Sequence, residues 1–182
     1  MKFRFQVAFN DNDYFEFNKF HLLRSPYGAK TRRSTIVMVT VIVAAFALVS
    51  LILGKFSASA FLRIIPLIII WLVFRLLMDN FLISTLKTQL KQMKKSGKMP
   101  YSQSSILEFY EKGFVEITES NKTEQKYSSI ERISVVDKEY IYLHTNSIMA
   151  YIIPYSVFES DEQRADFFVF LQSICPNIDL YT

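Results

Sequence analysis

Side chains that could carry out chemistry are few in this chain and widely spaced. A metal site needs several histidine, cysteine or carboxylate ligands at short spacing, but the sequence has only His21, His144 and a single cysteine, Cys175. Cys175 falls on the apolar face of an expected helix, where a thiol is buried and inert. The four glycines do not provide the spacing of a phosphate-binding loop. We therefore expect no catalytic, metal-binding or cofactor-binding residues, and a protein that is not an enzyme.

The densest group of charged side chains lies in residues 79–100, where five lysines face a single acid, Asp79. Apolar residues recur between these lysines at helical spacing, which predicts a basic amphipathic helix. Next to a bilayer, such a helix contacts anionic headgroups, so no nucleic acid is needed as a partner. The alternative is a stalk whose lysines are only solvated. The expected membrane-surface residues are Lys87, Lys91, Lys94, Lys95 and Lys98.

Two apolar stretches precede these lysines. Residues 35–53 carry no charge, and residues 56–78 form a second stretch of similar character. Each is long enough to cross the hydrocarbon core of a bilayer. Because the connection between them is very short, residues 35–78 predict an antiparallel transmembrane hairpin.

Three residues interrupt the second apolar stretch, namely Arg63, Pro66 and Arg75. Pro66 lacks a backbone N–H and predicts a kink. The two arginines lie near the ends of the stretch, so we expect them to anchor the helix. Arg63 can extend towards the outer interface, and Arg75 can either reach back to the inner interface or pair with Asp79 four residues on. A polar path through an oligomer is the alternative role for these arginines.

The distribution of charge predicts the orientation of the hairpin. Residues 1–34 contain seven basic side chains before it, and residues 79–100 contain five after it. By the positive-inside rule, this is a two-span protein of the plasma membrane with both termini in the cytoplasm. Residues 101–182 carry thirteen acidic and six basic side chains, a net charge of −7 that argues against direct binding of this part to anionic lipid.

The N-terminal segment, residues 1–34, opens with Phe3, Phe5 and Val7 alternating with polar residues, which predicts a half-buried strand. Asp13 and Glu16 have the spacing of a capping box and predict the start of a short helix. This strand and helix would precede the first span in the cytoplasm.

In residues 101–182 the apolar pattern becomes alternating, which predicts a β-rich domain. Ser160 and Gln163 then form a capping box for a C-terminal helix. Its expected apolar stripe is Ala165, Phe168, Leu171 and Cys175. The expected strands are 106–110, 114–118, 125–127, 130–136, 140–144 and 148–153.

These elements predict an α+β membrane protein, in which a two-helix transmembrane hairpin is joined to a cytoplasmic antiparallel β-domain. Six strands in residues 101–182 and one in residues 1–34 make seven. Seven strands closed by a C-terminal helix would form a barrel like that of pleckstrin-homology domains. The N-terminal strand can reach the later strands, because both would lie on the same side of the membrane. The sequence leaves open whether it completes the barrel.

Several motifs resemble the YcxB-like family of bacterial membrane proteins. The segment Asp13-Tyr14-x-x-Phe17-Asn18-x-x-His21 is similar to the opening of that family. This resemblance implies a bacterial membrane protein and supplies no catalytic residues; Tyr127 and Ile130 are expected to be core contacts. The motifs similar to the family's C-terminal domain are Tyr127-Ser128-Ser129-Ile130, Tyr140-Ile141-Tyr142-Leu143, Ile153-Pro154, Phe158 and Ser160-Asp161-Glu162-Gln163.

Three functions remain open at this level. The first is a non-enzymatic anchor that holds an interaction domain at the membrane, with the bilayer and a protein as partners, and a homo-oligomer is possible through small residues of the hairpin. The second is a sensor of membrane lipid or envelope stress. The third is an accessory subunit of a transporter or membrane enzyme.

Overall fold

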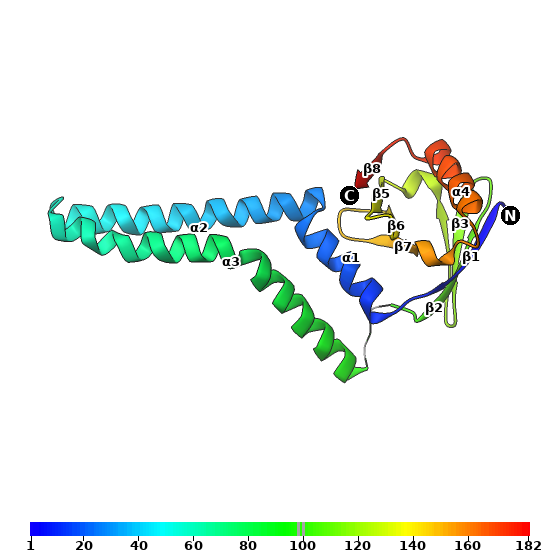
Figure 1. The fold of residues 1–182 in the computed structure, drawn as a ribbon, viewed down its shortest axis with the longest axis horizontal. Coiled ribbons are helices and arrows are strands. Elements are labelled where there is room, and N and C mark those ends of the chain that lie inside the picture. The colour runs from blue at the N-terminus through cyan, green and yellow to red at the C-terminus, as the bar shows by residue number, and fades with distance from the viewer. Residues whose placement is uncertain (98, 100) are drawn as a thin grey trace. The chain divides into compact units, whose positions relative to one another are not determined.

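The computed structural model describes residues 1–97, 99 and 101–182 and has an α+β fold (Figure 1). It divides into two compact units, one made of Met1–Phe17 and Met93–Thr182 and the other of Asn18–Gln92. In chain order, the elements are β1 (Phe3–Ala8), α1 (Asp11–Leu23), α2 (Pro26–Leu53), α3 (Ala58–Ser96), β2 (Ser104–Phe109), β3 (Gly113–Thr118), β4 (Lys122–Lys126), η1 (Tyr127–Ser129), β5 (Arg132–Val136), β6 (Tyr140–His144), β7 (Ala150–Pro154), η2 (Tyr155–Val157), α4 (Asp161–Ile174) and β8 (Ile178–Tyr181).

The strands form two four-stranded sheets, ordered β1-β2-β3-β4 and β7-β6-β5-β8. In the first sheet all neighbours are antiparallel, and β1 pairs with β2 along its whole length, from Phe3 opposite Phe109 to Ala8 opposite Ser104. The alternation expected for β1 is present, since Phe5 and Val7 are buried. One sheet is thus built from segments that precede and follow the two long helices.

The closed seven-stranded barrel expected from the sequence is wrong, because the strands form two separate four-stranded sheets. Two features explain the difference. The short helix η1 interrupts the chain between β4 and β5. On the other side, β8 lies parallel to β5 and occupies its edge, with Ile133 opposite Ile178. Sequence analysis did not predict β8, and this strand takes the position at which β5 could have met the first sheet.

Both sheets and α4 share one hydrophobic core. The fully buried ring of Phe167 lies edge-on to Phe5 and Phe109, at centroid distances of 4.8 and 5.0 Å. Such edge-to-face contacts add to the free energy of apolar burial. Tyr127 and Ile130, expected as core contacts, belong to this cluster or pack against it. From the second sheet the core includes Ile133, Val135, Ile141, Leu143 and Ile153.

Helix α4 begins at the predicted cap. The hydroxyl of Ser160 accepts a hydrogen bond from the backbone N–H of Gln163 at 3.2 Å, and the Gln163 side chain accepts one from the N–H of Glu159 at 2.8 Å. Leu171 and Cys175 of the expected stripe are buried, and Phe168 packs against the core. Phe167, expected beside the stripe, is buried as well, whereas Ala165 is exposed.

Helix α1 begins at Asp11, and its cap, Asn10, lies three residues before the predicted cap. The side chain of Asn10 accepts hydrogen bonds from the N–H groups of Asn12 and Asp13 at 2.8 and 3.1 Å, and the Asp13 carboxylate accepts one from the N–H of Asn10 at 2.9 Å. Asn10 is therefore the N-cap of α1, and Asp13, the third residue of the helix, completes the capping box, because its carboxylate accepts from the N-cap backbone. Its second oxygen accepts a hydrogen bond from the Tyr140 hydroxyl at 2.9 Å, which holds α1 against β6.

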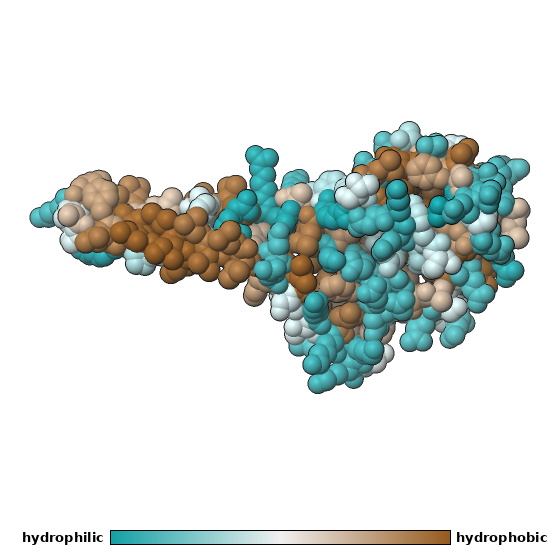
Figure 2. All heavy atoms as spheres, viewed as in Figure 1, coloured by the Kyte–Doolittle hydropathy of each residue, from teal (hydrophilic) through white to brown (hydrophobic). Residues whose placement is uncertain are grey.

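The other unit contains a hairpin of two long apolar helices, α2 and α3. Both are long and apolar enough to cross a membrane, and in the structure they leave large side chains such as Phe46, Leu53 and Leu76 exposed. Figure 2 shows these helices as a nearly continuous apolar surface on the face in view. Pro66 lies inside α3, where it removes one backbone hydrogen bond.

Close packing between α2 and α3 begins at their connection. Ala60 is fully buried there, and a Cβ atom on Gly54 would collide with the Cβ of Ala60, so only glycine permits this approach. Further along, the indole N–H of Trp71 donates to the hydroxyl of Thr40 at 3.0 Å.

Of the two contacts expected for Arg75, the pairing with Asp79 is not present among the described residues. Asp79 instead accepts two hydrogen bonds from the guanidinium of Arg32 on α2, at 2.8 and 2.9 Å. This pair joins the N-terminal part of α2 to the middle of α3.

Replacing Tyr140 with phenylalanine tests the contact between α1 and β6. Because the Asp13 carboxylate is buried, loss of its donor should lower the free energy of unfolding by about 1–3 kcal/mol. Burial and the hydrogen bond to Asp13 raise the pKa of Tyr140 from 10.0 to about 12. The stabilisation by the Tyr140 hydroxyl is thus complete below pH 10 and is lost as the pH rises towards 12. The free energy of unfolding should therefore fall less steeply with pH in Tyr140→Phe than in the wild type over this range.

Denaturant unfolding of the full chain in detergent, followed across this pH range, measures both effects. Tyr110→Phe is the control, because the hydroxyl of Tyr110 bonds to Glu108 at the exposed surface. Equal stability of Tyr140→Phe and wild type would contradict the role given to this hydrogen bond.

Candidate functional site

Four of the five lysines expected at a membrane surface, Lys87, Lys91, Lys94 and Lys95, are exposed on α3, and Lys98 lies outside the described residues. Lys94 forms an ion pair with Asp11 at 2.5 Å. The Tyr101 hydroxyl donates to the other oxygen of Asp11 at 2.7 Å, and these two hydrogen bonds lower the pKa of Asp11. Contact with a membrane stays a prediction for these lysines.

The histidines and the cysteine have structural surroundings. His144 is buried, with its Nε2 atom 3.0 Å from the hydroxyl of Ser134 on the neighbouring strand. His21 belongs to the other unit, where its ring stacks on Tyr27. Cys175 is buried at the end of α4. Within the described part of the chain, no group of three or more histidine, cysteine, aspartate or glutamate residues could hold a metal ion.

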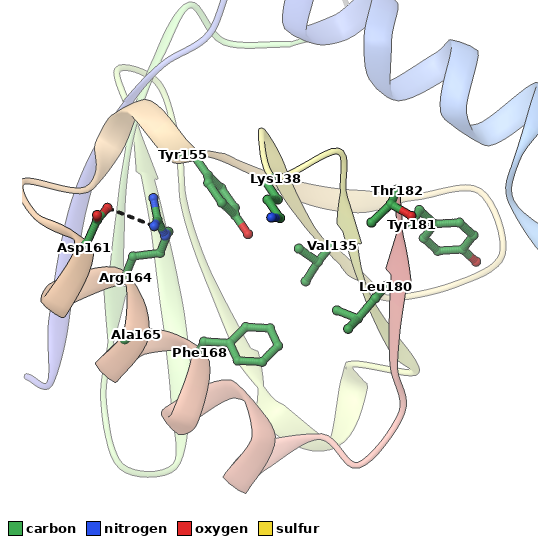
Figure 3. Close-up of a pocket in the computed structure, with 10 residues that line it drawn as sticks. All are labelled: Val135, Lys138, Tyr155, Asp161, Arg164, Ala165, Phe168, Leu180, Tyr181 and Thr182. Carbon is green, nitrogen blue, oxygen red and sulfur yellow. Dashed lines mark ion pairs between the residues drawn. The ribbon is translucent and has the colours of Figure 1, made fainter.

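A groove of about 320 Å³ lies between α4, β5 and β8 (Figure 3). Its walls are mostly apolar. Phe168 points from α4 towards Leu180 on β8, and Val135 of β5 lies between them. Leu180 is 69% exposed, so a large apolar side chain faces solvent beside the groove.

Polar groups lie at one end of this groove. Arg164 pairs with Asp161 at 2.8 Å, and its guanidinium lies over the ring of Tyr155, 5.0 Å from the ring centroid. These contacts neutralise and orient the arginine. Burial raises the pKa of Tyr155, which therefore stays a neutral hydrogen-bonding group at physiological pH. The remaining cation of the lining is Lys138.

Lys138 is held in a strained backbone conformation. The φ angles of Asp137 and Lys138 are 52° and 55°, and the N–H of Glu139 donates to the carbonyl of Val136 at 2.9 Å. Asp137 and Lys138 are thus the two central residues of a tight turn with positive φ at both positions, a turn type that favours asparagine and glycine. A lysine at such a position costs stability, and backbone strain of this kind collects at functional sites.

The groove can bind an apolar side chain or short segment, with Lys138 available to an anionic group at its end. Sequence analysis missed it for two reasons. Its residues are ordinary strand and helix residues without a motif, and one of its walls is β8, which was not predicted. Phe168 is half-buried and packs against the core, as its expected place in the apolar stripe predicted, and its exposed part lines the groove.

The fold and this groove define an α+β protein in which a helical hairpin of membrane-spanning length interrupts a two-sheet domain. Residues 109–170 match the family model of YcxB-like protein, so the chain carries a YcxB-like domain and the predicted family resemblance is confirmed. The matched residues run from the end of β2 into α4 and include Lys138, Tyr155 and Arg164 of the groove. No curated protein and no solved structure matches the chain.

Substituting Lys138 with glycine tests the strain in the turn. Glycine relieves roughly 1–2 kcal/mol of left-handed strain and adds roughly 0.5–1 kcal/mol of unfolded-chain entropy. The free energy of unfolding should therefore rise by up to about 1.5 kcal/mol, as measured by denaturant titration. Lys112→Gly is the control, because Lys112 lies in another hairpin turn without a positive φ and should lose stability. A fall in stability for both variants would refute the strain.

Proposed function

We propose that the protein is a non-enzymatic anchor in the plasma membrane that holds a small β-rich interaction domain at the cytoplasmic face. The observation that carries this proposal is the pairing of β1 with β2 across the inserted hairpin. Backbone hydrogen bonds between these strands require both to lie in the same compartment. The chain between them must therefore cross a bilayer an even number of times, which two spans satisfy.

The exposed surface of the hairpin supports insertion into a bilayer. Soluble proteins rarely expose contiguous apolar patches larger than a few hundred Å², yet α2 and α3 expose large apolar residues over most of their length (Figure 2). In water this surface would drive aggregation. In lipid it is solvated, and the helical backbone satisfies its own hydrogen bonds.

Basic residues support a cytoplasmic position for the domain. Lys30, Arg32 and Arg33 lie in the first turns of α2, before its apolar part, and the lysines of α3 follow its apolar part. The connection between the helices carries Lys55 alone. By the positive-inside rule, this imbalance favours cytoplasmic ends and an external connection.

The groove beside α4 supports the interaction role. Its open apolar wall would gain free energy by contact with an apolar segment of a partner protein, at about 25 cal/mol for each Å² removed from water. We propose that the partner docks an apolar side chain between Phe168 and Leu180. The acidic character of residues 101–182 favours a partner with a basic surface around that side chain.

Reporters fused to Met1 and Thr182 test the orientation. A fluorescent protein should be active at both ends, and an alkaline phosphatase inserted at Lys55 should be active outside. The intact chain should also need detergent for extraction. Activity of the two end reporters on opposite faces would contradict the shared sheet and the anchor together.

Replacing Leu180 with glutamate tests the groove. A charge at this exposed position should abolish photocrosslinks formed from a probe at Ala165, while the domain stays folded because Leu180 is on the surface. Val169→Glu is the matched control, since Val169 is 65% exposed on α4 and does not line the groove. Mass spectrometry identifies the crosslinked partner. The same crosslinks from all three proteins would rule out the groove as the interaction surface.

A further inference from the structure

A second cavity, of about 470 Å³, lies between α2 and α3 at the end of the hairpin opposite its connection. Three arginines line it, Arg32 and Arg33 from α2 and Arg75 from α3, together with one acid, Asp79. The lining therefore has a formal charge of +2. Such a concentration of positive charge within one cavity favours the binding of an anion.

Asp79 does not neutralise all three arginines. Both of its carboxylate oxygens accept hydrogen bonds from the guanidinium of Arg32, at 2.8 and 2.9 Å. Arg33 and Arg75 have no hydrogen bond or ion pair with any of the described residues. Two guanidinium groups from different helices thus line one cavity with their donors unused.

The apolar residues of the lining indicate where this cavity lies along the membrane normal. Ile36 and Val37 stand at the start of the apolar part of α2, and Met78 stands at the end of the apolar part of α3. The cavity therefore spans the boundary between the hydrocarbon-facing and polar parts of the hairpin. In an inserted hairpin, this is the depth at which phospholipid phosphates lie.

We propose that this cavity binds the phosphate group of an anionic phospholipid. Arg33 and Arg75 donate to the phosphate oxygens, for which the planar guanidinium has a matching arrangement of donors. The Arg32–Asp79 pair holds the two helices at the spacing that the phosphate needs. Ile36, Val37 and Met78 contact the glycerol and the first methylenes of the lipid. The inference rests on the proposed membrane insertion.

An isolated inorganic phosphate would use the two arginines but not the apolar lining, so the structure favours the lipid as the source of the phosphate. The position also differs from that of the predicted surface lysines, which follow on α3 after Asp79. Lysines attract anionic lipid as diffuse point charges, whereas a cavity with two guanidinium groups selects one headgroup.

Native mass spectrometry of the full chain, purified in a nonionic detergent and titrated with phosphatidylglycerol, tests the site. The wild type should retain one lipid per chain, at least about tenfold more tightly than phosphatidylcholine. Arg33→Gln and Arg75→Gln should each weaken binding about tenfold, because each removes charge-assisted hydrogen bonds. Arg33→Lys and Arg75→Lys keep the charge and the fold but lose the planar donors, so they should fall between wild type and glutamine.

Arg63→Gln is the matched control. Arg63 lies on the same helix, its Nε donates to the carbonyl of Ser59 within that helix, and it does not line the cavity. Binding by this variant should stay within about twofold of the wild type. An equal loss for Arg63→Gln, or no loss for Arg33→Gln and Arg75→Gln, would overturn the site.

Two further arms separate the possible failures. Inorganic phosphate should neither bind alone nor displace the lipid; if it does both, the ligand is free phosphate and the lipid assignment is wrong. Extraction of the chain from membranes without detergent would overturn the membrane anchor and the lipid site with it. A chain that requires detergent but binds phosphatidylglycerol and phosphatidylcholine equally overturns the lipid site alone.

Discussion

The hydrogen-bonded pairing of β1 with β2 is the constraint on which the rest of this structure depends. These strands lie on opposite sides of a long apolar insertion, yet they pair in register over six residues. Phe5 of β1 then supplies the surface on which the Phe167 ring of α4 packs. Removing β1 would expose an edge of β2 and open the core under α4. The N-terminal strand is thus an integral part of the domain whose other strands all follow the hairpin.

Much of this architecture is present in local patterns. Alternation in β1, the two apolar stretches and the Ser160 cap each depend on neighbouring residues, so their positions could be predicted. The start of α1 was misplaced because an aspartate can serve either as the N-cap of a helix or as the residue that accepts a hydrogen bond from the backbone N–H of the N-cap. Asp13 has the second role, with Asn10 as the N-cap. β8 was missed because it has only four residues, and its parallel partner β5 lies far away in the sequence.

The two candidate binding regions depend on contacts that sequence spacing does not reveal. Helical spacing pairs Arg75 with Asp79, but Arg32, which is 47 residues from Asp79, approaches that carboxylate from α2. Because Arg32 occupies Asp79, Arg75 and Arg33 line the same cavity without pairing to that carboxylate. The groove likewise depends on β8, whose Leu180 lies across from Phe168 of α4. In both regions, the residues were visible in the sequence, whereas their grouping required the tertiary structure.

The insertion of the hairpin between β1 and β2 also has a consequence for biosynthesis. If the hairpin inserts as proposed, β1 leaves the ribosome first during translation, and both helices have to enter the bilayer before its partner strand is made. In that topology, insertion shortens the search of β2 for β1, because the second helix returns the chain to the side of the bilayer on which β1 lies. Until they meet, β2 of one nascent chain can accept β1 from a neighbour, which makes strand-exchanged dimers the characteristic misassembly of this topology.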